Sequence, residues 1–583
     1  MTKVKSIDKM NFWNQIDWKV VEIAVFRLQK RIFKASQSGN VKLVHKLQRL
    51  LISSFYGKLW ATRRVTQDNQ GKVTAGVDGK KSLTSKQRLE LVNNLKVGKK
   101  AHPLRRVWIP KANGEKRGLG IPTIKDRALQ ALVKLGLEPQ WEATFEENSY
   151  GFRPARNCHD AIQAIFNSIK INSKYVLDAD ISGCFDNFDH NKLLTKLGTY
   201  PTLTNQVKAW LKNGVLDNKM LITTDKGTPQ EGVISPLLAN IALHGMELEV
   251  KKYARTLKGK KVHNEQTPNL IRYADDFLIL HKDLDVVLQC KVIMENWLKE
   301  IGLELKPSKT KISHTLLEHK GQVGFDFLGF NIRQYPVGKC HSGKLTNGSQ
   351  LGFKTIIKPS ESKVKSHLKK IGDVIRRHKS SPQEVLIKEL NPIIRGWSNY
   401  YSSVCSKETY SHCDHIIYQQ LKRWSERRHP KKSKSWVADK YWQSDYSNGK
   451  MRNWCFGTQE KGSIKYKLLK HADTPIVRHV KVKGNKSLFD GDLMYWCSRL
   501  GKHPEMSNQK ASLMKRQKGK CNHCGLYLKD GDIVEIDHVI PKSLGGGNEN
   551  TNLQLLHRHC HDSKTATDGS LKGRSKNAVI CTP

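Results

Sequence analysis

The chain has 583 residues, more than one hydrophobic core normally supports, so two to four domains are expected. It carries 101 Lys and Arg against 53 Asp and Glu, and the net charge of +48 predicts a nucleic-acid partner, with a ribosome-like or membrane-surface basic protein as the alternative. Its 12 cysteines are scattered, and no run of about 18 apolar residues occurs, which disfavours a disulfide scaffold and a membrane span.

The N-terminal part of the chain predicts a mixed fold. Residues 13 to about 60 have apolar positions at helical spacing, which predict two amphipathic helices with a positive polar face. The segment RRVWIPKANGEKRGLGIP alternates apolar residues around Asn113-Gly114, which is typical of a hairpin. Helical and strand signals then mix up to about residue 335, as in an α+β domain.

The C-terminal part changes character twice. From about residue 358 to 455 strand signals fade, and basic helical segments with aromatic residues take over. Residues 456 to 500 are polar and irregular, and suggest a connector or small binding module. The remaining residues carry their own motifs, so a domain boundary is expected near residue 500.

Two acidic segments predict a metal site. Asp275 and Asp276 lie between two apolar strand segments, and burying adjacent like charges is costly unless a cation neutralises them. In a second strand segment, alternation places Asp178 and Asp180 on one face. Acids from a strand and a hairpin could together hold two Mg²⁺ ions for phosphoryl transfer, in which positioning and charge neutralisation do most of the work.

A basic run lies between residues 422 and 434, with Trp424 and Trp436 nearby. Such a run is usually a solvated face, but aromatic rings among the cations favour a nucleic-acid surface, because bases stack on rings while cations hold phosphates. The residues expected to contact RNA are Arg423, Arg427, Arg428, Lys431 and Lys432.

Cysteine and histidine spacing near the C-terminus predicts a zinc site. Cys521-x-x-Cys524 and a later H-x-x-C ending at Cys560 supply four ligands for a closed tetrahedral site, which would stabilise a domain too small to bury much core. The fourth ligand is His557 or His559, and the spacing leaves both open.

The hairpin segment, the two acidic segments and several segments around them resemble the successive polymerase motifs of group II intron-encoded reverse transcriptase/maturases. In chain order the segments are TAGVDG, RRVWIPKANGEKRGLGIP, SYGFRPARNCHDA, DADISGCFDNFDH, GTPQEGVISPLLANIALHGME, RYADDFLIL, LELKPSKTKI and FDFLGF. The resemblance implies a multidomain α+β fold: a right-hand polymerase with fingers, palm and helical thumb, followed by a small zinc-bound domain. In that last domain Asp537-His538, Asn552 and His561 resemble the HNH nuclease signature, which implies the ββα-metal fold. The expected domains are 1–355 for fingers and palm with the N-terminal basic helices, 356–455 for thumb, 456–500 for a DNA-binding connector and 501–583 for the nuclease.

The resemblance assigns Asp180, Asp275 and Asp276 as catalytic carboxylates, with Asp180 and Asp275 bridging two Mg²⁺ ions. It also implies a group of residues that bind the incoming nucleotide. These are Lys111, Arg117, Phe185, Gln230 and Lys309. Of this group, Phe185 is similar to the family's steric gate against a 2′-hydroxyl, and Lys309 to its general acid.

The sequence departs from the family pattern at two positions near these motifs. Glu231 stands where the family often has Gly, and Ala75 where it often has Pro; neither change removes a chemical group. Asp178, Asp186 and Asp189 are further acids in this region, and we interpret them as structural or capping residues.

Residues 391–401, NPIIRGWSNYY, resemble the signature of the family's thumb, called domain X. This similarity implies that the thumb and the N-terminal basic helices bind intron RNA and help it to fold, with the RNA itself performing the cleavage.

The C-terminal segment also resembles the HNH nuclease signature, carried by Asp537-His538, Asn552 and His561. The resemblance implies that His538 is the general base and that Asp537 and His561 hold one divalent ion. Asn552 would be a ligand of this ion or an orienter of His538. The alternative is a structural zinc knuckle with incidental histidines.

The implied activity is that of an RNA-directed DNA polymerase and maturase. It would bind group II intron RNA, assist splicing, nick target DNA with the HNH domain, and extend the 3′ end with dNTPs during intron mobility. The expected location is the cytoplasm, at the nucleoid during action on DNA, or an organelle of a eukaryotic host. The alternatives are a splicing cofactor with vestigial catalytic sites and a domesticated reverse transcriptase.

Overall fold

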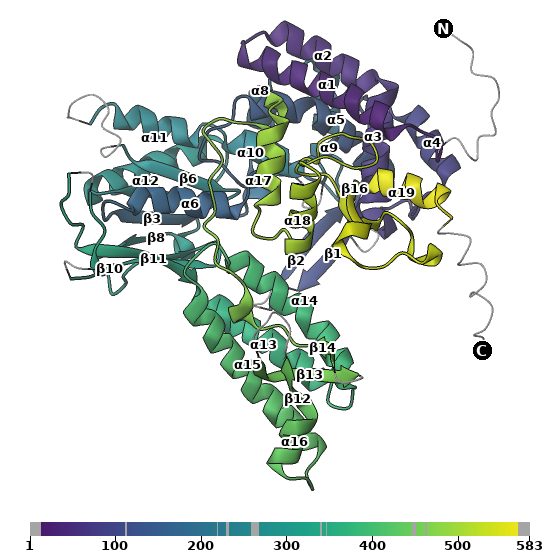
Figure 1. Cartoon of the computed structure of the whole chain (residues 1–583). Helices are drawn as coiled ribbons and strands as arrows, with labels where there is room; N and C mark the ends of the chain where they lie inside the picture. The colour runs from purple at the N-terminus through teal and green to yellow at the C-terminus, as the bar shows by residue number, and fades with distance from the viewer. Residues whose placement is uncertain are drawn as a thin grey trace.

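The computed structural model describes residues 13–110, 114–217, 220–228, 232–257, 267–338, 341–345, 347–445, 451–460 and 463–569. Lys111, Gln230 and Glu231 lie outside these ranges. The structure is a mixed α/β protein of several units, with a helical arm projecting from a larger body (Figure 1).

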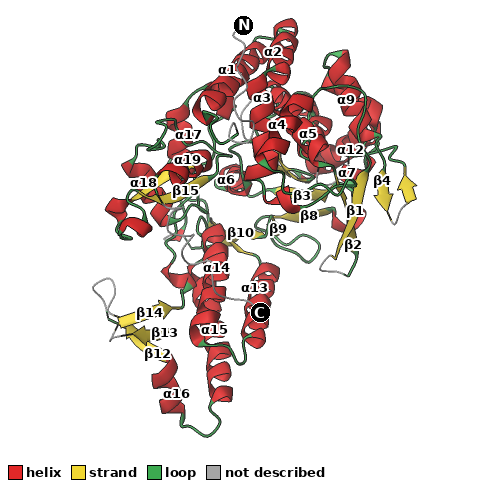
Figure 2. Cartoon of the chain, turned by 90° about the vertical axis from the view of Figure 1, so that its right-hand side faces the viewer, coloured by secondary structure: helices red, strands yellow, loops and turns green. Residues whose placement is uncertain are grey.

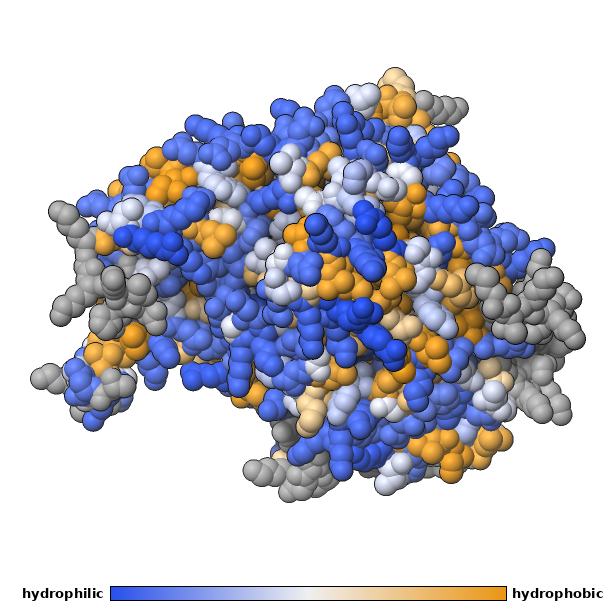
Figure 3. All heavy atoms as spheres, turned by 90° about the horizontal axis from the view of Figure 1, so that it is seen from above, coloured by the Kyte–Doolittle hydropathy of each residue, from blue (hydrophilic) through white to orange (hydrophobic). Residues whose placement is uncertain are grey.

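The N-terminal unit contains α1 (Trp18–Gln37), α2 (Val41–Ser53), α3 (Phe55–Arg63) and α4 (Ser85–Asn94). The amphipathic helices predicted here are confirmed, although the segment forms three helices up to residue 63 because extended Ser54 ends α2 and caps α3. All but α4 pack on α5 (Ile124–Glu142), whose inner face is buried. Viewed from above, the surface is mostly hydrophilic with interspersed hydrophobic patches (Figure 3).

The predicted hairpin is confirmed: β1 (Leu104–Pro110) pairs antiparallel with β2 (Lys116–Ile121), and Ile109 lies opposite Arg117. Gly114, in the connecting turn, has a φ of +85°, which glycine adopts at no steric cost. On its other edge β1 pairs in parallel with β4 (Val215–Asp217), which continues into β5 (Met220–Ile222). The sheet order is therefore β2-β1-β4-β5.

The central sheet has the order β6-β7-β3-β8 and is antiparallel throughout. Its strands are β3 (Tyr175–Asp180), β6 (Asn269–Tyr273), β7 (Asp276–His281) and β8 (Lys311–His314). α12 (Leu284–Glu300) packs on β3 and β7, and α6 (Cys158–Ile169) packs on β6. Alternate side chains of β3 therefore lie in two different hydrophobic cores. Leu177 packs in one core, and Val176 packs in the other. This burial on both faces fixes the register that places the acids at the strand end.

The following segments complete the body. The helices are α7 (Cys184–Asn187), α8 (His190–Leu197), α9 (Pro201–Leu211), α10 (Ser235–Leu243) and α11 (Met246–Ala254), and the strands are β9 (Phe325–Phe327), β10 (Phe330–Pro336) and β11 (Phe353–Pro359).

The helical arm contains α13 (Glu361–Arg377), α14 (Gln383–Tyr401), α15 (Lys407–Arg428) and α16 (Lys434–Tyr441) (Figure 2). The sequence predicted no strands in this part of the chain, and that prediction is wrong. A sheet packs against α14, and its strands are β12 (Trp442–Asp445), β13 (Arg452–Glu460) and β14 (Ser463–Lys467). Buried Tyr441 and Phe456 lie in the arm's own core, so the strands are held by tertiary packing. β13 crosses residue 455, where a domain division was expected.

Residues 468–490 return from the arm to the body, where buried Asp160 at the start of α6 accepts hydrogen bonds from His479 Nε2 (3.0 Å) and Val482 N (2.9 Å). Next come α17 (Leu493–Gly501) and α18 (Asn508–Arg516), and then the C-terminal unit of β15 (Val534–His538), β16 (Leu553–His557) and α19 (Arg558–Thr567). Among the described residues, no helix is both long and apolar enough to cross a bilayer.

Candidate active sites

The acids predicted to bind metal meet at the end of the central sheet. Asp180 on β3 is the register partner of Asp276 on β7, and Asp275 lies in the turn between β6 and β7. Burial, and then the charges of Asp275 and Asp180, raise the pKa of Asp276 to about 7. Like charges directly opposite one another on a sheet are destabilising. The site therefore favours a bound cation.

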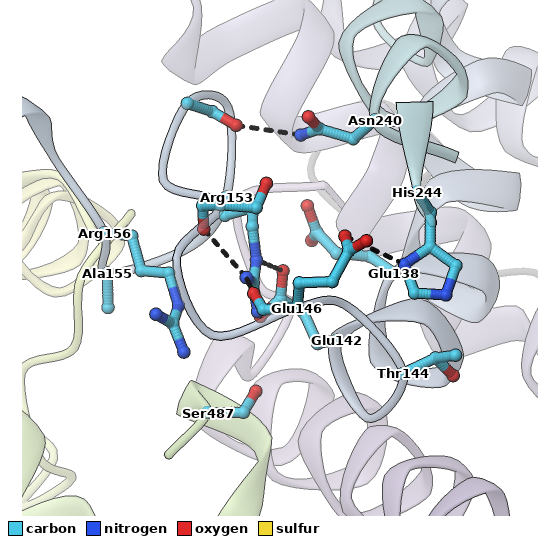
Figure 4. Close-up of polar contacts among 12 residues, drawn as sticks. Glu138, Glu142, Thr144, Glu146, Arg153, Ala155, Arg156, Asn240, His244 and Ser487 are labelled. Carbon is cyan, nitrogen blue, oxygen red and sulfur yellow. Dashed lines mark hydrogen bonds and ion pairs between the residues drawn. The ribbon is translucent and has the colours of Figure 1, made fainter. Parts of the chain in front are cut away.

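A network centred on buried Arg272 holds the turn that carries Asp275. Its guanidinium donates to Ala274 O (3.0 Å), Asn240 Oδ1 (2.9 Å) and Ser149 Oγ (2.7 Å). Asn240 Nδ2 in turn donates to Gly151 O (2.8 Å), a contact drawn in Figure 4. Sequence reasoning missed Arg272 and Asn240, although both stand inside the polymerase motifs. Their contacts hold the turn that carries Asp275 in place.

The loop that approaches this turn is itself anchored. Arg153 donates to both carboxylate oxygens of Glu142 (2.9 and 3.0 Å) and to Ser149 O (2.8 Å), as seen in Figure 4. In the same view His244 Nδ1 lies 3.0 Å from Glu146 Oε2. Burial would raise the pKa of Glu146, but its hydrogen bond with His244 and the neighbouring positive charges outweigh burial and lower it to about 2. These buried contacts anchor the loop beside the turn that carries Asp275.

Replacing Gly151 with alanine should impair DNA synthesis without affecting DNA nicking. A Cβ at residue 151 would lie 2.3 Å from Ala274 N and 2.9 Å from Tyr273 C, so the turn carrying Asp275 must move. A misplacement of about 1 Å can cost roughly a hundredfold in rate. Primer extension and DNA nicking would be measured on the same preparation. Gly98→Ala, where nothing lies within 4 Å of the added Cβ, is the control, and equal rates in the two variants would contradict this account.

A cleft of about 830 Å³ opens beside these acids and brings together three of the predicted nucleotide-binding residues. Arg117 from β2, Phe185 from α7 and Lys309 all line it, with Asp180 and Asp275. Lys309 Nζ lies 2.7 Å from Asp180 Oδ2, and this hydrogen bond raises the pKa of Lys309. The other two predicted residues, Lys111 and Gln230, lie outside the described residues.

The cleft wall around Phe185 is closely packed. Its half-buried ring meets the Phe152 ring edge-on, with centroids 6.0 Å apart. Gly227, with φ of +72°, lies against the same segment, where a Cβ would come 2.4 Å from Phe185 O.

The additional acids have different surroundings. Asp189 caps α8 by accepting from Lys192 N at 2.8 Å, as predicted. Asp186 lines the cleft instead of serving only as a cap. Burial, and then the charge of Asp276, raise the pKa of Asp178 to about 7, so the acids at this strand end oppose one another's ionisation.

The basic run lies at the far end of the arm. The side chains of Arg423, Arg427, Lys431 and Lys432 are exposed. Arg428 differs, since its guanidinium donates to Lys379 O (2.8 Å) and Ser381 O (3.0 Å). The expectation that Trp424 helps to form a stacking surface is wrong, because this ring is 5% exposed and donates to His378 O; Trp436 is 38% exposed. The candidate RNA surface is therefore smaller than the sequence suggested.

The predicted zinc ligands gather in the C-terminal unit. One ligand atom from each of Cys521, Cys524, His557 and Cys560 lies within 4.8 Å of the others, and all four residues are buried. His557 Nδ1 is 3.3 Å from Cys524 Sγ. Three thiols and an imidazole suit a closed tetrahedral zinc site. The geometry favours His557 over His559 as the fourth candidate ligand.

The predicted nuclease residues converge between β15 and α19. Asp537 Oδ1 lies 3.6 Å from His561 Nε2, a separation that a shared cation could bridge. His561 Nδ1 faces Glu535 Oε2 at 3.2 Å. Sequence reasoning missed Glu535, although it stands two residues before Asp537 and thus on the same strand face.

The His538 ring lies within hydrogen-bond distance of Asn548, with Nε2 3.1 Å from Asn548 Oδ1, and two other side chains hold the backbone around it. Lys564 Nζ lies 3.0 Å from Asp537 Oδ2 and donates to His538 O at 2.7 Å. Asn552 exchanges hydrogen bonds with Ile540 N (2.8 Å) and Ile540 O (3.1 Å). Its amide therefore fixes the loop after His538, which favours the orienting role over the metal-ligand role.

Known protein families match these units in the same order. The model of the N-terminal domain of reverse transcriptase matches residues 13–95, and that of reverse transcriptase (RNA-dependent DNA polymerase) matches residues 109–332. The group II intron maturase-specific domain matches residues 364–442, and HNH endonuclease matches residues 521–567. Fold, sites and matches together define a reverse transcriptase joined to a maturase domain and a DNA endonuclease.

Curated relatives agree with this class. The group II intron-encoded protein LtrA of Lactococcus lactis subsp. cremoris is 30% identical over 449 residues, covering 64% of this chain and 73% of LtrA. Protein YkfC of Escherichia coli is 32% identical over 349 residues, covering 53% and 88% respectively. Maturase-like protein 1 of Euglena gracilis is 27% identical over 406 residues, covering 68% and 78%. The chain belongs to the group II intron-encoded proteins and is an intron-encoded reverse transcriptase and maturase with an endonuclease domain.

Proposed function

We propose that the protein acts in intron mobility. It binds its own intron RNA, promotes splicing, nicks one strand of a DNA target with the C-terminal unit, and extends the new 3′ end with dNTPs on the RNA template. In this proposal residues 1–355 form fingers and palm of a right-hand polymerase, 356–455 the thumb, 456–500 a DNA-binding connector and 501–583 the nuclease. The protein would work in the cytoplasm at the nucleoid, or in an organelle of a eukaryotic host.

The observation that carries the proposal is the convergence of Asp180, Asp275 and Asp276 beside a cleft lined by Arg117 and Lys309. Two Mg²⁺ ions held there, with Asp180 and Asp275 as shared ligands, would activate a 3′-hydroxyl and stabilise the leaving pyrophosphate. The two cationic side chains would hold the triphosphate, with Lys111. Lys309 would release Asp180 to the metal and approach the departing pyrophosphate.

The other residues predicted from the sequence have the following roles in this proposal. Phe185 would crowd a 2′-hydroxyl, and Gln230 would lie along the nascent base pair. In the nuclease, His538 would deprotonate water while Asp537 and His561 hold one divalent ion, with Asn552 fixing the adjacent loop. Zinc would be held by Cys521, Cys524, His557 and Cys560. Arg423, Arg427, Lys431 and Lys432 would bind intron RNA, and Arg428 would stabilise the arm that presents them.

Sequencing the RNA that copurifies with the protein tests the biological role. We expect one spliced intron RNA that contains this reading frame, and we expect the particle to nick a DNA target and synthesise cDNA at the nick. A particle that holds the intron RNA but makes no cDNA with dNTPs and Mg²⁺ would instead indicate a splicing cofactor. A protein without bound intron RNA would favour a domesticated polymerase.

A further inference from the structure

The C-terminal unit rests directly on the N-terminal helices. In Figures 1 and 2, α19 and its strands lie beside the segments that begin the chain. Lys529 Nζ lies 2.5 Å from Glu22 Oε1 on α1, and Arg63 Nη2 lies 2.8 Å from Asp562 Oδ2. Arg64 donates to Gly531 O at 2.6 Å and lies 3.3 Å from Asp532 Oδ1.

This contact surface runs up to the zinc ligands. Because Nδ1 of His557 faces Cys524 Sγ, its Nε2 points away from the metal position and lies 3.5 Å from Asp532 Oδ2. The neighbouring ring of His559 stacks on His557 with centroids 5.0 Å apart, and meets Trp60 of α3 edge-on at 6.1 Å. The outer side of the zinc ligand is therefore enclosed by both units.

Glu22 completes this enclosure from the polymerase side. One ligand atom from each of Glu22, His557 and His559 lies within 4.8 Å of the other two. Within the described chain, Glu22 Oε2, His557 Nε2 and His559 Nε2 are buried without a hydrogen bond, and the three residues are at most 7% exposed. Buried polar atoms without a hydrogen bond are costly, so these three atoms need a proton or a cation that they share.

A second metal ion does not fit this position. Lys529 already neutralises Glu22, and Arg64 stands close by. A zinc-bound imidazole also keeps its proton on the distal nitrogen, so His557 would have to lose that proton to bind another ion. The chemistry that fits is an N–H on His557 Nε2 directed at carboxylates, as in the outer shells that orient zinc-bound histidines.

We propose that zinc loading locks the nuclease onto the polymerase, with Glu22 serving as an outer-shell carboxylate supplied by the N-terminal helix. Zinc orders the segment from Cys521 to Asp532, and this segment presents Lys529 to Glu22 and Asp532 to Arg64. Without zinc, the ordering of this segment is lost, and with it the contacts of Lys529 with Glu22 and of Asp532 with Arg64, so the two units separate. The inference rests on the zinc occupancy proposed above.

The test uses the full-length protein and two readouts, the rate of zinc transfer to a colorimetric chelator and hydrogen exchange in α1. We expect stripping of zinc to raise exchange across Trp18–Gln37 while primer extension persists. Glu22→Gln should speed zinc release about tenfold, the lower end of typical outer-shell effects. Glu549→Gln removes the same charge from an exposed position in the C-terminal unit and should match the wild type. Arg64→Met provides a second interface variant should Glu22→Gln fail to fold.

The possible failures are separable. A wild-type protein whose metal content shows no zinc would overturn both the occupancy and the coupling. If zinc is bound, but both interface variants release it at the wild-type rate, or if chelation leaves the protection of α1 unchanged, the coupling alone is wrong.

Discussion

Replacing Asp275 with asparagine will reduce RNA-templated DNA synthesis roughly a hundred- to a thousandfold or more, the usual loss when one group that stabilises transition-state charge is removed. Asp275 lines the cleft at the strand end where Asp180 and Asp276 meet, so the substitution removes a proposed ligand of both ions. The fold should persist, because the change relieves repulsion: burial raises the pKa of Asp275 and the Asp180 charge adds to that effect. Primer extension on an RNA template with Mg²⁺ measures the loss.

Asp178→Asn is the matched control for this experiment. It removes a carboxyl group from the same face of β3, but Asp178 does not line the cleft among the described residues. Synthesis should stay within about tenfold of the wild type, since long-range charge effects are small beside loss of a metal ligand. Equal losses in both variants would mean that total charge, and not coordination by Asp275, governs the reaction.

Replacing His538 with alanine will reduce DNA nicking roughly a hundred- to ten-thousandfold, the range expected for a general base. His538 ends β15 beside Asp537, and its backbone carbonyl is held by Lys564. Extension of a supplied primer should remain at the wild-type rate, because the polymerase cleft is lined by other residues. Nicking of a labelled target duplex and primer extension, assayed in parallel, separate the two activities.

His523→Ala is the matched control for His538→Ala, because it also removes one imidazole from the C-terminal unit. His523 is exposed within the C-x-x-C loop and is not among the gathered candidate zinc ligands. Its loss should leave nicking unchanged. If His538→Ala still nicks at the wild-type rate, the C-terminal unit is a structural zinc knuckle, and another nuclease must supply the primer end.

The sequence predicted those features that depend on local pattern. Alternation around Asn113-Gly114 indicated the β1–β2 hairpin, and the apolar strands flanking Asp275 indicated where the carboxylates would lie. Strand alternation could equally have revealed Glu535 beside Asp537. The network of Arg272 could not be found in this way, because its partners Ser149 and Asn240 come from distant segments.

Long-range packing also decided several choices that spacing left open. His557 and His559 both satisfied the ligand spacing, and only the fold of β16 and α19 directed His557 to the cysteines. Trp424 became a core residue because the turn after α13 covers it, and β12 to β14 formed because α14 offers an apolar face.

The sequence by itself determined the order of the domains and the chemical groups each one carries, since periodicity and spacing act over a few residues and specify elements and motifs directly. Only the tertiary structure decided which elements meet. The ion pair of Glu22 with Lys529 joins residues 507 positions apart. No local pattern encodes such a contact, because it depends on how whole helices and strands bury their apolar faces against one another.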